Sequence, residues 1–368
     1  MRFVRWILIL VVIVTIFYVL YQKDIHEKQK VTTLMNATMD VLSKEVRYTW
    51  QHALAHLSIK QEWFHRLQTH LKEEIVGMDA YLHGLFITLL VSWHALVEGV
   101  PGLAKTKTIT LLSRYLDLSF QRIQFTPDML PSDIIWAEIF DTKSQQFTVL
   151  KWPIFAHCIL ADEINRTTPK VQSALLEAMQ EGQVTISGKT FPLPKPFFVL
   201  ATQNPLEHEG TYPLPEAQVD RFLLHIVVDY PSYEQEQDIV KKHQGVKEHT
   251  HSSPVFSLAQ LTVFQQEVQK VMISDALLAY AVRLVQATRT AQSPFSIWAS
   301  PRASLALVQS AKAVAWLKAS AEVSLEDLQM MAVPVLRHRV ALAYDRKRQW
   351  ISLDDQLVEL LVHVPIIT

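Results

Sequence analysis

The segment from His94 to Thr106 constrains the fold more than any other part of the sequence. Its first residues, HALVE, are typical of a short buried strand, the next eight, GVPGLAKT, contain two glycines, and a helix is predicted from Thr106 to Leu116. A strand, a glycine-containing loop and a helix in this order can bind phosphate, because backbone N–H groups and the helix N-terminus converge on one point. We therefore expect an α/β nucleotide-binding domain.

The residues of this loop have distinct expected roles. The predicted phosphate-binding residues are Gly99, Val100, Pro101, Gly102, Leu103, Ala104, Lys105 and Thr106. Lys105 is expected to reach the β- and γ-phosphates of ATP, and Thr106 to ligate Mg²⁺. The pattern G-x-x-x-x-G-K-[ST] has glycine where this chain has Ala104, so a methyl group is added close to the phosphates. On the loop alone, a glycine turn that happens to precede a helix remains the alternative.

The rest of the chain reads as an α/β domain followed by a helical one. Short β-rich runs alternate with helical stretches from about Leu71 to Tyr230, which predicts a parallel sheet covered by helices. Strands are expected at 94–98, 120–125, 158–162, 197–202 and 223–228, helices at 106–116 and 171–181, and a hairpin within 183–196. After Pro231 only helical periodicity remains, with helices expected at 258–271, 275–290, 301–318 and 324–343. The expected domains are an anchor (1–22), a helical stalk (23–64), a nucleotide-binding core (65–243) and a helical lid (244–368).

Two adjacent carboxylates end the third predicted strand. The apolar run CILA leads directly into Asp162 and Glu163. Carboxylates at the carboxyl end of a buried strand are costly unless they serve a cation or a water molecule. We expect Asp162 to hold Mg²⁺ and Glu163 to polarise the attacking water. The alternative, that both residues merely begin a loop, is hard to combine with the loop at Lys105.

Polar residues beside the next two strands complete the predicted site. Asn204 follows the fourth strand, where its amide can orient the same water, although a polar turn explains it equally well in isolation. Arg221 precedes the fifth strand, at the end of the sheet away from the chain's own nucleotide. Its guanidinium could serve a neighbouring subunit as an arginine finger, or pair on the surface with Asp220 or Glu216.

The N-terminus has the composition of a membrane anchor. Between Phe3 and Tyr21 the only charged residue is Arg5, and roughly twenty apolar residues are enough to cross a bilayer. A cleavable signal peptide is the rival interpretation, but no site of small residues follows the apolar run. We expect a single-pass membrane protein with its body in the cytoplasm, where ATP is available, although the basic residues on the two sides of the run give conflicting orientations.

Several longer segments resemble the MoxR family of AAA+ ATPases. They are VEGVPGLAKT, RIQFTPDMLPSD, LADEINRTTPKVQSALLEAMQEGQV, ATQNPLEHEGTYPLPEAQVDRFL and SPRASLALVQSAKA, within residues 65 to 345. The resemblance implies Walker A at 99–106, Walker B at Asp162 and Glu163, sensor 1 at Asn204, an arginine finger at Arg221 and a cis sensor 2 at Arg302. It also implies pore-facing projections within 127–153 and 183–197, and alanine is common in the family at the position of Ala104.

The resemblance and the composition together give the expected function. The resemblance implies a ring ATPase, hexameric, that remodels protein clients such as von Willebrand factor A domain proteins or assembling metalloenzymes, with ATP and Mg²⁺ as cofactors. A membrane-bound scaffold that binds nucleotide with little turnover is the alternative, which the presence of Glu163, Asn204 and Arg221 together disfavours. A nucleic-acid motor is a third hypothesis. It is disfavoured because 35 Lys and Arg against 36 Asp and Glu leave a net charge of −1 and no basic footprint for a phosphate backbone.

Overall fold

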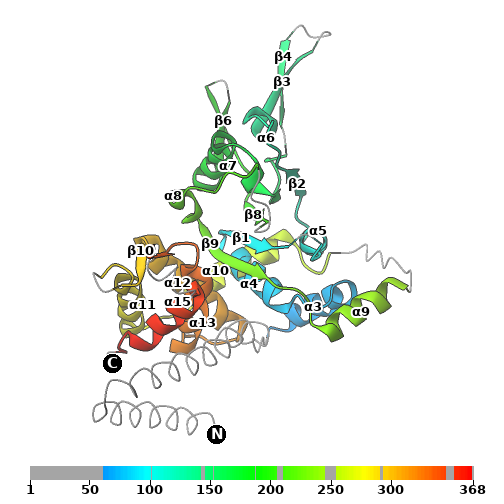
Figure 1. The fold of residues 1–368 in the computed structure, drawn as a ribbon. Coiled ribbons are helices and arrows are strands. Elements are labelled where there is room, and N and C mark those ends of the chain that lie inside the picture. Colours follow the sequence, from blue (N-terminus) through cyan, green and yellow to red (C-terminus); the bar gives the residue numbers. More distant parts are fainter. Residues whose placement is uncertain are drawn as a thin grey trace, which may run out of the picture. The chain divides into compact units, whose positions relative to one another are not determined.

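A parallel five-stranded sheet forms the centre of the fold. The computed structural model describes residues 61–100, 102–141, 146–151, 153–186, 188–204, 210–244, 254–290, 293–344 and 352–366. The strands are β1 (His94–Gly99), β2 (Phe120–Gln124), β5 (Cys158–Asp162), β8 (Phe198–Gln203) and β9 (Phe222–Val228). They pair in the order β2-β5-β8-β1-β9, all in parallel (Figure 1). The predicted five-stranded parallel sheet followed by a helical lid is confirmed.

The two faces of the sheet belong to two separate hydrophobic clusters. Ala95 and Val97 of β1 belong to one cluster, whereas Leu96 between them belongs to the other. This alternation follows from the period of two residues in a strand. Every residue of β5 is buried, because β5 lies between β2 and β8 and is covered on both faces. Helices therefore have to cover both faces of the sheet.

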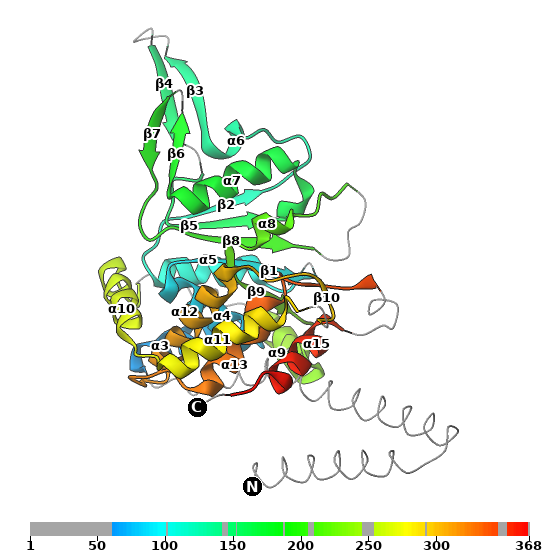
Figure 2. The same ribbon diagram turned by 90° about the vertical axis from the view of Figure 1, so that its left-hand side faces the viewer.

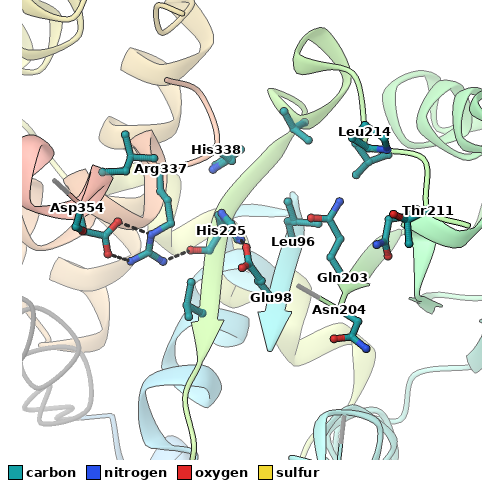
Figure 3. A pocket seen from close by; sticks show the side chains of 16 residues that line it. Leu96, Glu98, Gln203, Asn204, Thr211, Leu214, His225, Arg337, His338 and Asp354 are labelled. Atoms are coloured by element: carbon teal, nitrogen blue, oxygen red, sulfur yellow. Dashed lines mark hydrogen bonds and ion pairs between the residues drawn. The ribbon is translucent and has the colours of Figure 1, made fainter. Parts of the chain in front are cut away.

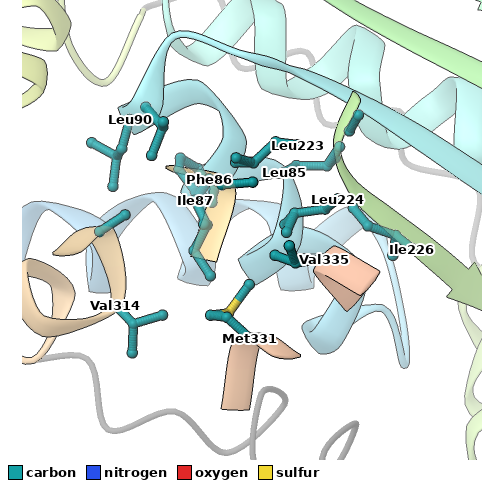
Figure 4. Close-up of a cluster of buried hydrophobic side chains, with 14 of the residues drawn as sticks. Leu85, Phe86, Ile87, Leu90, Leu223, Leu224, Ile226, Val314, Met331 and Val335 are labelled. Atoms are coloured by element: carbon teal, nitrogen blue, oxygen red, sulfur yellow. The ribbon is translucent and has the colours of Figure 1, made fainter. Parts of the chain in front are cut away.

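Helix α4 (Asp79–Val91) is the central element of the first cluster. Its residues from Tyr81 to Val91 are all buried, so it has no polar face. Figure 4 shows side chains of α4 lying between side chains of β9 and side chains of two lid helices. Val314 and Met331 belong to these lid helices. The other helices of the core are α3 (Glu62–Glu74), α5 (Lys105–Tyr115), α6 (Ser132–Ile135), α7 (Pro169–Glu181), α8 (Glu216–Val219) and α9 (Tyr233–Gln244), with a 3₁₀ turn η1 at Ile164–Arg166.

The helical lid follows the core. Its elements are α10 (Leu258–Lys270), α11 (Asp275–Ala287), α12 (Pro301–Leu317), α13 (Leu325–Leu336) and α15 (Leu353–His363), with a small sheet of β10 (Phe295–Ile297) and β11 (Ala341–Leu342). A serine precedes each of α10, α11, α12 and α13, and its hydroxyl accepts a hydrogen bond from a backbone N–H of the first turn. Such N-caps define where these helices begin.

Two hairpins extend from the core. The first consists of β3 (Trp136–Asp141) and β4 (Gln146–Lys151), and the second of β6 (Gln183–Ile186) and β7 (Lys189–Pro192). Figures 1 and 2 show both hairpins on the same side of the core, away from the lid helices. The second hairpin lies where one was predicted. The first lies inside 127–153, where the sequence patterns alone did not predict strands.

The predicted membrane location requires correction. The expected anchor, residues 1–22, and the stalk up to residue 60 lie outside the described residues. Among the residues that the structure does describe, no helix combines the length and the apolar character needed to cross a bilayer. A run of apolar residues meets the length criterion for an anchor, but composition alone does not establish a spanning helix. We therefore withdraw the single-pass location and the orientation that was derived from it.

Candidate active site

The loop between β1 and α5 has backbone features that only a few residue types tolerate. A Cβ atom on Gly99 would lie 2.9 Å from the carbonyl oxygen of Val228, so glycine allows β1 and β9 to approach closely at this point. Gly102 has a φ of +86° and Ala104 a φ of 52°. The left-handed conformation costs a residue with a Cβ about 1–2 kcal/mol. Glycine is usual at the position of Ala104 because it adopts the left-handed conformation without this cost. In this chain Ala104 adopts the same conformation with a Cβ, so its backbone is strained.

Lys105 lies among carboxylates at the carboxyl edge of the sheet. Its Nζ donates a hydrogen bond to the carbonyl oxygen of Gly99, which β1 contributes. Burial lowers the pKa of Lys105, and the carboxylates of Asp162, Glu163 and Glu98 act in the opposite direction. The fold thus brings the predicted loop lysine and the two predicted Walker B carboxylates together, as their assigned roles require.

Asp162 is held by hydrogen bonds from both neighbouring strands. Its Oδ1 accepts from the hydroxyl of Thr202 on β8 at 2.5 Å. Its Oδ2 accepts from Nε and Nη2 of Arg122 on β2, at 3.0 and 2.7 Å. Only 9% of the residue is exposed. Hydrogen bonds to both oxygens therefore hold this carboxylate in one orientation.

Glu163 has an unusual backbone conformation for a residue with a side chain. Its φ of 58° and ψ of 48° lie in the left-handed region, where strain is typical of functional residues. Its N–H donates to the hydroxyl of Thr202 at 2.9 Å, and its carboxylate lies 2.8 Å from Nε of Arg166. One oxygen of the carboxylate, Oε2, is therefore paired with a cation in this conformation, in an ion pair that is partly exposed.

Asn204, the predicted sensor 1, directly follows β8 and is 6% exposed. Gln172 on α7 links the segments beside it. The side-chain amide of Gln172 donates to the carbonyl oxygens of Ile164 and Thr167, after Walker B, and of Tyr212, after sensor 1. Because β5 and β8 are paired in parallel with Ala161 level with Ala201, Asn204 lies at the same edge of the sheet as Asp162 and Glu163.

The two predicted arginines lie at the opposite end of the sheet. Phe222, the first residue of β9, is level with His94, whereas Val228 is level with Gly99. Arg221 is consequently separated from the phosphate-binding loop by the length of a strand, roughly 3.3 Å for each residue. The side chain of Arg302, at the start of α12, lies 4.0 Å from Asp220, beside Arg221. This contact places Arg302 beside Asp220, near the end of β9 that is far from the chain's own loop, and its predicted cis role stays a prediction.

Comparisons with known proteins agree with this geometry. Residues 94–224 match the family "ATPase family associated with various cellular activities (AAA)", and residues 286–359 match the "AAA lid domain". The chain is 43% identical over 290 residues to "Chaperone MoxR1" of Mycobacterium tuberculosis, an alignment that covers 77% of this chain and 76% of that protein. It is 42% identical over 299 residues to "Uncharacterized protein YeaC" of Bacillus subtilis, with 81% and 93% covered. The chain belongs to the MoxR family of AAA ATPases.

A solved structure and a further relative also support membership of this family. The crystal structure of a predicted ATPase from Cytophaga hutchinsonii superposes with a TM-score of 0.79 at 38% identity, and the match covers 90% of this chain and 100% of that one. The "Protein MoxR" of Paracoccus denitrificans is 26% identical over 319 residues, with 78% and 91% covered. The resemblance stated from the sequence is therefore confirmed.

The donor atoms of this MoxR-family site fit Mg²⁺ bound together with a nucleotide. Thr106 and Asp162 offer a hydroxyl and a carboxylate, the oxygen ligands that Mg²⁺ prefers. Within the described part of the chain, no group of three or more His, Cys, Asp and Glu residues could hold a metal ion by itself. A site with one carboxylate suits Mg²⁺, which commonly takes its other ligands from substrate phosphates and water.

A cavity of about 880 Å³ adjoins the site. Asn204 lines it together with Glu98 and residues of the lid, as Figure 3 shows. His225 Nε2 lies 3.0 Å from Glu98, and Arg337 of the lid donates to the carbonyl oxygen of His225 and pairs with Asp354. Hydrogen bonding from His225 lowers the pKa of Glu98, and burial lowers the pKa of His225. A polar network thus connects the residue before Gly99 with the lid.

Sequence reasoning missed four residues that contact the predicted site: Arg122, Arg166, Thr202 and His225. Thr202 carries the clearest signal, since it is a hydroxyl at the end of a buried strand two residues before Asn204. The other three are ordinary charged or aromatic residues in their segments. Their roles depend on partners from other elements, so no local pattern identifies them.

Proposed function

We propose that this MoxR-family ATPase hydrolyses ATP with Mg²⁺ and acts as a chaperone that remodels protein clients. The observation that supports the proposal best is the meeting of Lys105 with the carboxylates of Asp162 and Glu163 at the carboxyl edge of the sheet. A lysine for the phosphates, a carboxylate for the metal and a second carboxylate for water are the groups that phosphoryl transfer to water needs.

In the proposed reaction each residue has one task. Lys105 exchanges the carbonyl oxygen of Gly99 for the β- and γ-phosphates. Thr106 and Asp162 would hold Mg²⁺, which would neutralise phosphate charge. Glu163 accepts a hydrogen bond from the attacking water, and the amide of Asn204 orients that water.

The site of one subunit is incomplete without its neighbour in this proposal. Arg221 and Arg302 lie at the end of the sheet away from the chain's own loop, yet a guanidinium near the γ-phosphate accelerates phosphoryl transfer about 10³- to 10⁵-fold. A ring in which one subunit's β9 end faces the next subunit's loop would bring these arginines to the phosphates. We therefore propose a closed ring, with six subunits as the expectation from the family resemblance.

A protein is the proposed client. One relative is named a chaperone, and the two hairpins, β3–β4 and β6–β7, extend from the core where they could contact a client. Clients with a von Willebrand factor A domain, or metalloenzymes under assembly, are proposed on the resemblance alone. The net charge of −1 remains an argument against a nucleic-acid substrate.

Mixing two inactive variants tests the shared site. Arg221→Ala should bind ATP almost normally but hydrolyse it slowly, and Glu163→Gln should bind it without turnover. In randomly mixed rings about a quarter of the interfaces pair an intact Glu163 with a neighbour's intact Arg221, so up to about a quarter of the parental rate should return. The double variant mixed with Glu163→Gln is the matched control, because no interface then has an intact Glu163.

Two outcomes would contradict the proposed shared site and the proposed hydrolysis. Energy transfer between labelled subunits has to confirm that the rings exchange. If exchange occurs and mixing restores no activity, Arg221 does not act on a neighbour. If the parental chain binds ATP and never releases phosphate, the scaffold function replaces the proposed hydrolysis.

A further inference from the structure

A cation from the edge strand lies against the carboxylate that is proposed to hold Mg²⁺. Arg122 on β2 and Asp162 on β5 are in neighbouring strands, where Gln124 is directly paired with Asp162. The guanidinium donates two hydrogen bonds to Oδ2 of Asp162, and its Nη2 also donates to Oε1 of Gln124 at 2.6 Å. Arg122 and Asp162 are therefore both held in place by strands of the sheet.

Asp162 is held from two opposite sides. Strand β5 lies between β2 and β8, so Arg122 approaches the carboxylate from one side and Thr202 from the other. The hydroxyl of Thr202 donates to Oδ1 at 2.5 Å and accepts from the N–H of Glu163 at 2.9 Å. Rotation of the carboxylate would break bonds on both sides at once.

The strand order places the phosphate-binding loop on the same side of Asp162 as Thr202. Strand β8 lies between β5 and β1, and β1 leads into the phosphate-binding loop. Oδ1 is thus on the side of the loop, and the guanidinium of Arg122 is on the far side. We propose that Arg122 is a positioning residue for the metal-nucleotide complex, which holds Oδ2 so that Oδ1 stays directed toward Thr106 and the phosphates. This inference rests on the proposed ATPase function.

Two effects of Arg122 on Mg²⁺ binding have opposite signs. A hydrogen-bonding partner that orients a ligating carboxylate is worth about 10- to 100-fold in metal affinity or activity. Its positive charge, in contrast, repels the metal ion. The side chain of Arg122 is 48% exposed, so water and salt screen that repulsion, whereas the two hydrogen bonds that fix Asp162 are lost completely on substitution. We therefore expect orientation to dominate, and removal of Arg122 to weaken metal binding.

Metal binding can be measured without turnover. Glu163→Gln serves as the background in every sample, and Mn²⁺ replaces Mg²⁺ so that electron paramagnetic resonance reports the free ion in the presence of ATP. Arg122→Leu should raise the dissociation constant of Mn²⁺ about tenfold or more, and Arg122→Lys, which keeps the charge but not the two-bond geometry, should lie between. Arg66→Leu, at an exposed arginine on α3, is the matched control and should change nothing.

Two further measurements keep the outcomes distinct. Binding of a fluorescent ATP analogue without metal should be the same in Arg122→Leu and its background, and urea unfolding should show that both are folded. Unchanged metal affinity in Arg122→Leu would refute the positioning role, and tighter binding would mean that the guanidinium competes with the metal. If the Glu163→Gln background binds the analogue without metal but no Mn²⁺, or binds no analogue at all, the proposed ATP site itself is wrong.

Discussion

Lowering the pH from 7 to 5 should destabilise the protein through His94. This first residue of β1 is 8% exposed. Its Nδ1 accepts a hydrogen bond from the N–H of Val199 on β8 at 3.1 Å, so its Nε2 carries the hydrogen that is donated to the carbonyl oxygen of Met179 at 3.2 Å. Both nitrogens are satisfied in the neutral ring, and a proton added to Nδ1 would face another N–H. Burial lowers the pKa of His94 from 6.5 to about 4.

The size and sign of the effect follow from these two pKa values. The unfolded chain binds a proton near pH 6.5 and the folded chain only near pH 4, so between these values the unfolded state holds more protons. The stabilisation is fully present above pH 6.5, amounts to roughly 3 kcal/mol, and is lost as the pH falls toward 4. About 2 kcal/mol of it should disappear between pH 7 and pH 5.

Urea unfolding of the parent and of His94→Gln at both pH values measures this loss. Glutamine can accept from Val199 and donate to Met179 but does not titrate, so the variant should lose about 2 kcal/mol less than the parent. His225 and His338 also have pKa values lowered by burial, and comparing the two proteins cancels their contribution. His65→Gln, at an exposed position on α3, should behave as the parent does. Equal losses in the parent and in His94→Gln would refute the argument.

Three more substitutions probe the predicted ATP site, two of them in the phosphate-binding loop. Lys105→Ala removes a charged donor to the phosphates and should weaken ATP binding, measured by calorimetry, about 10- to 100-fold. Glu163→Gln should bind ATP as tightly as the parent but release no phosphate. If Lys105→Ala bound ATP as tightly as the parent, the phosphate-binding loop would be assigned wrongly. Gly99→Ala places a Cβ 2.9 Å from the carbonyl oxygen of Val228 and should cost about 1–3 kcal/mol in urea unfolding. Unchanged stability would show that β1 and β9 can separate without cost.

The parts of the site that lie within one continuous pattern could be predicted from the sequence. The loop from Gly99 to Thr106 lies between a strand and a helix, and Asp162 ends an apolar run, so each is recognisable from its immediate neighbours. Their meeting follows from the rule that parallel strands place their carboxyl ends at one edge. The strained conformation of Ala104 could not be predicted in the same way, because alanine gives no indication of a left-handed backbone.

The residues that hold the site in place could not be predicted. Arg122 and Asp162 are 40 positions apart, and no periodicity indicates that β2 pairs with β5. His94 likewise has the appearance of an ordinary strand residue until α7 and β8 are placed beside it. Their roles come from contacts between elements.

The sequence by itself determined the sheet, the helical lid and the edge at which a nucleotide would bind, because hydrophobic periodicity and turn residues act over a few neighbouring positions. Only the tertiary structure decided where the lid docks. The buried guanidinium of Arg339 donates to the side chain and carbonyl of Asp220 and to the carbonyl oxygens of Leu223 and Phe222, 116 to 119 positions away. A buried arginine has to be paired, and Arg339 and Arg302 of the lid both lie against the carboxylate of Asp220. Local patterns carry no information about such a partner, so the sequence predicted a helical lid but not the contacts by which the lid docks on the core.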